Sequence, residues 1–106
     1  MGIKELTSPV QIGGTEYETV AASQTNQVLG GTGAKGDFIS RAIITVVTAA
    51  TSTVTLTDGT TGIVIMAANT AIGCYSIELG MRAATGPWKI TTGAGATVIA
   101  VGQFSA

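Results

Sequence analysis

The sequence contains no histidine and only one cysteine, Cys74, among its 106 residues. Without histidine, the chain lacks the side chain that most often acts as a general base and as a metal ligand. One cysteine cannot form an internal disulfide, and its place in an apolar stretch predicts a buried structural thiol. We therefore expect no metal, no cofactor and no enzymatic activity, because the remaining residues suggest no acid–base or metal-binding set.

Charged residues are also scarce, at 10% of the chain, and the net charge is −1. An ordinary soluble domain has about 25%. No basic patch is present, so we expect no nucleic-acid partner. The longest apolar stretch is too short and too interrupted to span a bilayer, so we expect no membrane partner either. The low charge fits a neutral Thr/Ser-rich surface or a surface covered by partners, and we favour the second interpretation.

The clearest pattern is an alternation of apolar and polar residues from Cys74 to Arg82. A period of two over this length predicts a half-buried strand. The pattern breaks at residues 83–87 and resumes at Trp88. Because the chain has one tryptophan and two tyrosines, we expect its core to be built around Trp88 and Tyr75. The predicted core residues are Val54, Leu56, Tyr75, Ile77, Leu79, Trp88 and Ile90.

Other segments also have the character of strands, with Gly-rich turns between them. Residues 15–22 form a weakly patterned first strand, and residues 96–104 form the last one. The segment from Asp37 to Thr48 is apolar on both faces, which is typical of a central strand or of one that reaches an interface. Its two predicted faces are Phe38, Ala42, Ile44 and Val46 on one side and Ile39, Ile43 and Val47 on the other.

The most distinct hairpin is predicted at Asp58-Gly59, a two-residue type I′ turn signal between strands at residues 53–57 and 62–67. No segment has a helical period. The chain is therefore predicted to be all-β, a small antiparallel β-sandwich or jelly-roll-like barrel of about seven or eight strands. Residues 15–106 form this single domain, and residues 1–14 precede it as an N-terminal arm or edge segment.

Three patterns suggest a ligand but are better explained by structure. The G-x-G-x-x-G match at residues 31–36 is followed by a β-branched strand, so no helix N-terminus is available to hold a pyrophosphate. The alternating threonines at residues 51–57 resemble an ice-binding row, but threonine is also a common exposed-strand residue. Tyr75 and Trp88 together suggest a platform for a sugar or a base, although core packing is the favoured interpretation.

Three stretches resemble small proteins encoded beside the head genes of tailed bacteriophages. These are YSIELGMR at residues 75–82, GPWKITTG at residues 86–93 and VIAVGQF at residues 98–104. The resemblance covers residues 37–106 and rests on structural motifs. It implies a virion structural protein, a capsid decoration or cement protein, made in the bacterial host cytoplasm and located on the outer capsid surface.

The partner implied by this resemblance is a major capsid protein, and the implied assembly is a small homo-oligomer, with a trimer favoured. The alternative is a receptor- or carbohydrate-binding module of a phage head or tail fibre, with Trp88 and Tyr75 as its platform. For the capsid-binding role we expect contacts in the arm, the Gly-rich loop and the two-faced strand. The predicted interface residues are Ile3, Leu6, Val10, Val28, Leu29, Ile39, Arg41 and Ile43.

Overall fold

The computed structural model describes residues 16–49 and 52–106, and within those ranges it contains eight strands and no helix. The all-β prediction is confirmed, whereas the predicted arm at residues 1–14 lies outside the described residues. The same ranges hold no helix long and apolar enough to cross a membrane. The strands are β1 (Glu16–Val20), β2 (Gln27–Val28), β3 (Phe38–Val46), β4 (Val54–Asp58), β5 (Thr61–Met66), β6 (Gly73–Arg82), β7 (Trp88–Thr91) and β8 (Ala96–Gln103).

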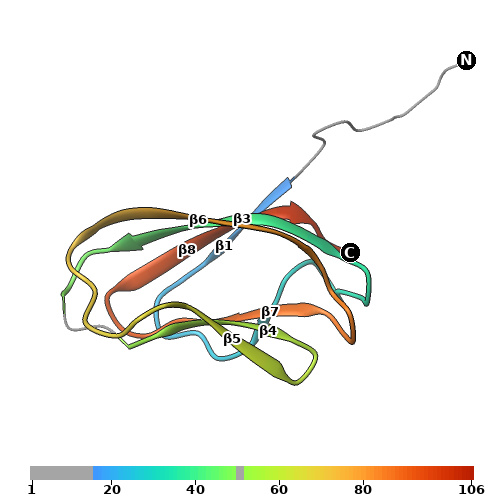
Figure 1. Ribbon diagram of the computed structural model, residues 1–106, viewed down its shortest axis with the longest axis horizontal. Helices are drawn as coiled ribbons and strands as arrows, with labels where there is room; N and C mark the ends of the chain where they lie inside the picture. Colours follow the sequence, from blue (N-terminus) through green and yellow to red (C-terminus); the bar gives the residue numbers. More distant parts are fainter. Residues whose placement is uncertain (1–15, 50–51) are drawn as a thin grey trace, which may run out of the picture.

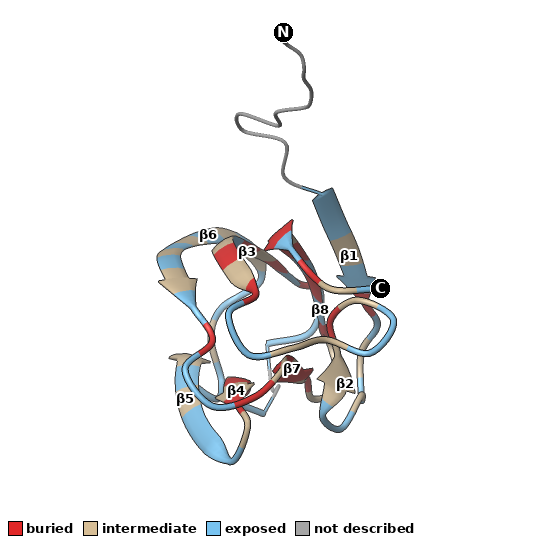
Figure 2. Cartoon of the chain, turned by 90° about the vertical axis from the view of Figure 1, so that its right-hand side faces the viewer, coloured by how far each residue is buried: buried red, intermediate tan, exposed pale blue. Residues whose placement is uncertain are grey.

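The strands form two four-stranded antiparallel sheets that lie face to face (Figures 1 and 2). Sheet A has the order β1-β8-β3-β6, and sheet B has the order β2-β7-β4-β5. Buried residues gather on the inner faces of both sheets (Figure 2). Inward and outward residues alternate along β4 and β8, as expected for strands with one face on a core.

The strand order identifies the sandwich as a jelly roll. β1 pairs with β8, β2 with β7, β3 with β6 and β4 with β5. The first half of the chain therefore pairs with the second half in reverse order, as in one long hairpin whose tip is the β4–β5 turn. The additional pairs β3–β8 and β4–β7 result when this hairpin is rolled up into two sheets.

The core lies between the sheets, around Trp88, which is 2% exposed and donates a hydrogen bond of 2.8 Å from Nε1 to the Asp37 carbonyl oxygen. The predicted core residues Val54, Leu56, Trp88 and Ile90 are buried, so these predictions are confirmed. Tyr75 and its neighbours on β6 are only half-buried, and the prediction of a core built around Tyr75 is wrong. The reason is that β6 is an edge strand of sheet A. The half-buried residues of the prediction are Tyr75, Ile77 and Leu79.

The predicted two-faced alternation along β3 is wrong at the start of the strand. Its register against both β6 and β8 shifts between Ile39 and Arg41. A β-bulge moves the following residues to the opposite face. Ile39 therefore joins Ala42 and Ile44 in the core, while Phe38 is only half-buried.

The predicted hairpin exists, but its turn lies one residue later than expected. Asp58 pairs with Thr61, so the two central residues are Gly59 and Thr60. Gly59 has a φ of +62°, whereas the φ of Thr60 is not positive. A type I′ turn requires positive φ at both central residues, while a type II′ turn has glycine at the first. The turn is therefore of the II′ kind, and the Asp58 side chain is available for another role.

Candidate functional site

One end of the sandwich carries no charged residue within the described ranges. Four connections lie together there, because β1, β3, β5 and β7 all end at this side (left in Figure 1). Their residues are alanine, glycine, serine, threonine, asparagine, glutamine, valine and isoleucine only. We call this surface the charge-free end. It consists of residues 21–26, 47–49, 52–53, 67–72 and 92–95.

The charge-free end also exposes two large aliphatic side chains, Val47 at 63% and Ile72 at 65%. They leave neighbouring strands at the same level, because Val46 pairs with Gly73 in the β3–β6 ladder. The charged residues of the described chain lie on strands or in the β2–β3 connection at the opposite end. The molecule is therefore asymmetric along its strand direction, with one neutral, partly apolar end.

Thr92 fixes two of the connections to each other. Its Oγ1 donates to the Ala21 carbonyl oxygen at 2.6 Å and accepts from the Gln24 amide at 3.0 Å. The Thr92 amide donates to the Gln24 carbonyl oxygen at 2.9 Å, and the Ser23 amide donates to the Gly93 carbonyl oxygen at 3.1 Å. Four hydrogen bonds thus hold the β1–β2 connection against the β7–β8 connection.

The β3–β4 connection packs against the same region with little free space. A Cβ atom on Gly93 would lie 2.5 Å from Ser52 Cβ, and one on Gly95 would lie 2.8 Å from Thr48 Cβ. Both distances are shorter than real carbon–carbon contacts, so only glycine permits this approach. The β1–β2 and β7–β8 connections and the described part of the β3–β4 connection are therefore held together by close packing as well as by hydrogen bonds.

The three non-glycine residues of positive φ in the described chain all lie at the charge-free end. They are Ser23 at +60°, Asn26 at +49° and Asn69 at +62°. Such conformations are uncommon for residues with a Cβ and persist where the surroundings fix them. The Asn26 amide, for example, donates to Thr91 Oγ1 at 2.9 Å. The neutral surface is thus built from loops with defined rather than generic backbone shapes.

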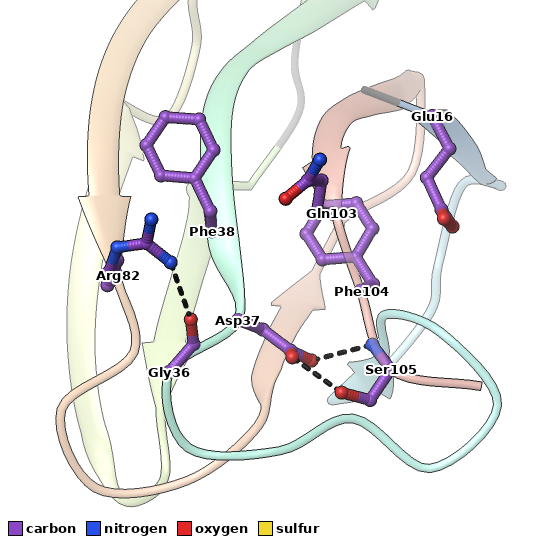
Figure 3. A pocket seen from close by; sticks show the side chains of 8 residues that line it. All are labelled: Glu16, Gly36, Asp37, Phe38, Arg82, Gln103, Phe104 and Ser105. Carbon is purple, nitrogen blue, oxygen red and sulfur yellow. Dashed lines mark hydrogen bonds between the residues drawn. The ribbon is translucent and has the colours of Figure 1, made fainter. Parts of the chain in front are cut away.

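The opposite end of the sandwich contains a hollow of about 350 Å³ (Figure 3). Arg82 and Glu16 line it from β6 and β1, the two edge strands of sheet A. The Arg82 guanidinium donates to the Gly36 carbonyl oxygen at 3.3 Å and lies 5.6 Å from the centre of the Phe38 ring. The arrangement holds Arg82 over Phe38 and closes the end of sheet A. The residues that line the hollow are Glu16, Gly36, Asp37, Phe38, Arg82, Gln103, Phe104 and Ser105.

The Asp37 carboxylate beside this hollow is used within the fold. It accepts hydrogen bonds from the Ser105 amide at 2.9 Å, from Ser105 Oγ at 2.7 Å and from the Ala34 amide at 2.9 Å. Burial alone would raise the pKa of Asp37, but these hydrogen bonds outweigh it and hold the pKa below its ordinary value. Asp37 thereby attaches the C-terminal residues to the start of β3.

The lowered pKa of Asp37 predicts a loss of stability in acid. A carboxyl group whose pKa is lower in the folded state stabilises the fold above its unfolded pKa of about 3.9, and this contribution disappears as the pH falls through the folded pKa. We expect the urea concentration at the midpoint of unfolding to decrease as the pH falls below about 4. Asp37→Asn is expected to weaken this fall, because it removes the titrating group. Urea unfolding between about pH 2 and pH 7 measures it, and an equal fall in the variant would contradict the assignment.

The predicted interface residues divide into three groups. Leu29 and Ile39 are 0% exposed, so the prediction is wrong for these two, which belong to the core instead. Val28, Arg41 and Ile43 retain exposed surface on the outer faces of the sheets and stay predictions. Ile43 lies opposite Ile99, which is 36% exposed. The remaining three, Ile3, Leu6 and Val10, lie outside the described residues.

One further prediction on a single side chain is wrong, and one alternative interpretation is excluded. Cys74 is exposed rather than buried, because it points outward from β6, with its Sγ 3.8 Å from Thr45 Oγ1. Trp88 is buried and bonded to the Asp37 backbone, so it cannot form a ligand platform with Tyr75. Tyr75 itself uses its hydroxyl group within the fold, since it donates to the Ala71 carbonyl oxygen at 2.7 Å.

Sequence reasoning missed the charge-free end because its parts are far apart in the chain. Each of the four connections is a short uncharged segment that resembles any other turn. Only the strand order brings them together. Within the described ranges, no group of three or more metal-ligating side chains is close enough to hold an ion. Comparison of the chain with protein-family models, with characterised proteins and with solved structures gives no match.

Proposed function

We propose that the chain is a non-enzymatic virion structural protein that binds the outside of a phage capsid and stabilises it, with the charge-free end as its capsid-binding surface. The observation that carries this proposal is the collection of four uncharged connections, with Val47 and Ile72 exposed, at one end of the sandwich. The resemblance of residues 37–106 to head-associated phage proteins supports the choice of a capsid as the partner.

The composition of the charge-free end suits burial against another protein. Charged residues are depleted from the centres of protein interfaces, because burying an unpaired charge is costly. Val47 and Ile72 supply apolar area that is favourable to remove from water. The threonine, serine and asparagine side chains around them can exchange hydrogen bonds with water for hydrogen bonds with a partner.

The fixed shape of these loops also favours binding. Ordering mobile side chains and loops opposes association, so a surface already held in one conformation loses less entropy on binding. Hydrogen bonds through Thr92 and the close packing at Gly93 and Gly95 provide this preorganisation. The jelly roll itself occurs in viral capsid proteins and also in lectins and cupins, so the fold supports the proposal only by analogy.

Stabilisation of the shell follows from mass action. A protein that binds the assembled capsid but not its separated subunits shifts the equilibrium toward the assembled state. Several copies bound across junctions between capsomers would each add contacts that the bare shell lacks. Heads carrying the protein should therefore resist heat and chelators better than heads without it.

The proposal predicts that a charge placed at the charge-free end weakens capsid binding. Ile72→Asp would bury an unpaired carboxylate in the interface, and we expect at least about a tenfold loss of affinity. The matched control is Val64→Asp. Val64 is 60% exposed, similar to Ile72, but it lies on β5 within sheet B. Co-sedimentation with heads assembled from the major capsid protein encoded with this chain measures both affinities.

Three results of this experiment would count against the proposal. One is an absence of wild-type binding at micromolar concentration. Another is equal binding by Ile72→Asp and the wild type, which would remove the charge-free end from the interface. The third is an equal loss in Val64→Asp, which would show a general effect of added charge. Unchanged thermal melting of both variants verifies that the fold is intact.

A further inference from the structure

The two flanks of the sandwich differ in how well they are closed. At one flank, the edge strands β5 and β6 lie above one another (left in Figure 2). Their inward-facing apolar side chains pack against the core but remain partly exposed. Among the described residues, no further strand lies beyond these two edges to cover their side chains. We call this surface the open flank. It consists of Ile63, Ile65, Tyr75, Ile77, Leu79 and Met81.

The other flank, between β1 and β2, is closed. Val20 and Leu29, the inward apolar residues there, are both 0% exposed. On β1, the Glu18 carboxylate accepts from Gln27 Nε2 at 2.9 Å and from the Gly30 amide at 2.7 Å. This flank ends in a satisfied polar network. The open flank has an apolar surface in the same position.

Within residues 16–49 and 52–106, the backbone of the open flank is also unpaired on its outer side. Among the eight described strands, β5 pairs only with β4, and β6 pairs only with β3. Gly80, with a φ of +60°, interrupts the regular part of β6 near its end and leaves residues 73–79 as a regular edge. A free edge of this length beside an apolar surface is a template for pairing with another strand.

We propose that the open flank is covered by the open flank of a second copy of this chain, so that β6 of each copy pairs with β5 of the other. β5 runs toward the charge-free end, and β6 runs away from it. A twofold axis parallel to the strands preserves these directions and places β6 beside β5 of the partner in antiparallel orientation. Sheet A of one copy then continues into sheet B of the other on both sides.

The size of the open flank suits such a pair. β6 has 10 residues and β5 has 6, so at about 3.3 Å per residue the flank is roughly 33 Å long at β6 and roughly 20 Å long at β5. Two sheets about 10 Å apart, with their side chains, make the flank roughly 20 Å deep. Each copy therefore contributes on the order of 500 Å², and the total of about 1,000 Å² is the size expected of a weak, reversible interface.

Self-pairing is favoured because the open flank is the apolar one. A head-to-tail trimer, the assembly implied by the resemblance, would set this surface against the polar network of Glu18 and Gln27 on the closed flank of a neighbour. Pairing β6 with β6 of the partner would direct the two charge-free ends oppositely. The β6–β5 arrangement directs both toward one surface. This choice between the two pairings rests on the proposed function, whereas the use of the open flank does not.

Sedimentation velocity of the full chain from about 1 to about 100 µM tests the assembly. We expect a reversible shift to the mass of a dimer. Ile63→Lys places a charge in the open flank and is expected to be monomeric at all these concentrations. Its matched control is Val64→Lys, the next residue of β5, which points to the outer face opposite Thr55 and should leave the dimer intact. A far-ultraviolet circular dichroism spectrum shows whether Ile63→Lys has folded.

Hydrogen exchange of the wild-type chain provides a second measurement that needs no variant. Backbone amides of β5 and of residues 73–79 should exchange more slowly as concentration rises, whereas those of β1 and β2 should not change. A monomer at 100 µM, a trimer, or a dimer without this protection would overturn the proposal. If Ile63→Lys is monomeric but still binds heads, the proposed function holds without the dimer. If Ile72→Asp loses head binding but remains a dimer, the dimer does not depend on the capsid-binding surface.

Discussion

Replacing Asp58 with alanine is expected to lower the free energy of unfolding by about 3 kcal/mol or more. The Asp58 carboxylate accepts from three consecutive backbone amides of the β6–β7 connection. Oδ2 accepts from Ala84 at 2.8 Å, while Oδ1 accepts from Thr85 at 3.2 Å and from Gly86 at 3.1 Å. Asp58 is only 9% exposed. Removing the carboxylate would leave several donors without their partner.

The position of Asp58 explains why its effect should exceed that of an ordinary surface acid. It is the last residue of β4, and the β4–β5 turn beside it lies against the β6–β7 connection. Burial alone would raise the pKa of Asp58, but the hydrogen bonds from residues 84–86 outweigh it and hold the pKa below its ordinary value. The ionised carboxylate therefore joins two connections that the chain separates by 26 to 28 residues.

Urea unfolding at neutral pH measures this effect. Asp58→Asn keeps one acceptor oxygen, so it should lie between the wild type and Asp58→Ala. The control is Glu78→Ala. Glu78 is 75% exposed, and its carboxylate is 4.0 Å from Arg41, so its loss should change stability by less than about 1 kcal/mol. Equal stability of Asp58→Ala and Glu78→Ala would show that the three amides find other acceptors.

The second large effect is expected from Gly102→Ala on β8. An added Cβ would lie 2.1 Å from the Phe38 carbonyl oxygen and 2.9 Å from Ile39 Cα. Both atoms belong to the backbone of β3, which cannot move without breaking its ladder. Overpacking a rigid site commonly costs about 1–3 kcal/mol and sometimes more. We expect Gly102→Ala to destabilise the fold by about 3 kcal/mol or more. A variant that does not fold at all would agree with this expectation.

Gly62 on β5 is the matched glycine. It is also a strand residue without positive φ, but a Cβ there would meet only Thr55 Cγ2 at 3.4 Å. Gly62→Ala should therefore leave stability unchanged or raise it by up to about 1 kcal/mol, because alanine restricts the unfolded chain. Thermal unfolding of both variants gives the comparison. Similar melting temperatures would mean that β8 can shift away from β3 at Gly102.

Local patterns were sufficient to predict much of the fold. The alternation along residues 74–82 and the β-branched segments elsewhere predicted strands where the structure has them, except for the two-residue β2, which lies in the segment interpreted as a Gly-rich loop. Val54, Leu56 and Ile90 were predicted as core residues from the same period of two, and they are buried. These predictions succeed because a strand with one face on the core needs apolar residues at every second position, wherever the strand lies in the sheet.

Predictions that depend on the neighbours of a strand were less successful. Tyr75 and Cys74 belong to a well-patterned strand, yet one is half-buried and the other exposed, because β6 is at an edge. Ile39 is in the core because a bulge shifts the register of β3 by one residue. Asp58 was predicted as a turn residue, but its carboxylate binds a connection 26 or more residues away.

The sequence by itself determined that this chain is all-β, where most of its strands lie, and that it has little charge to cover its surface. The tertiary structure decided where on the surface the uncharged segments lie. Rolling one long hairpin into a jelly roll brings four uncharged connections to one end, and it leaves β5 and β6 as edges whose core-facing side chains are partly exposed. Strand pairing between distant segments produces both features, and no local period records which segments will meet.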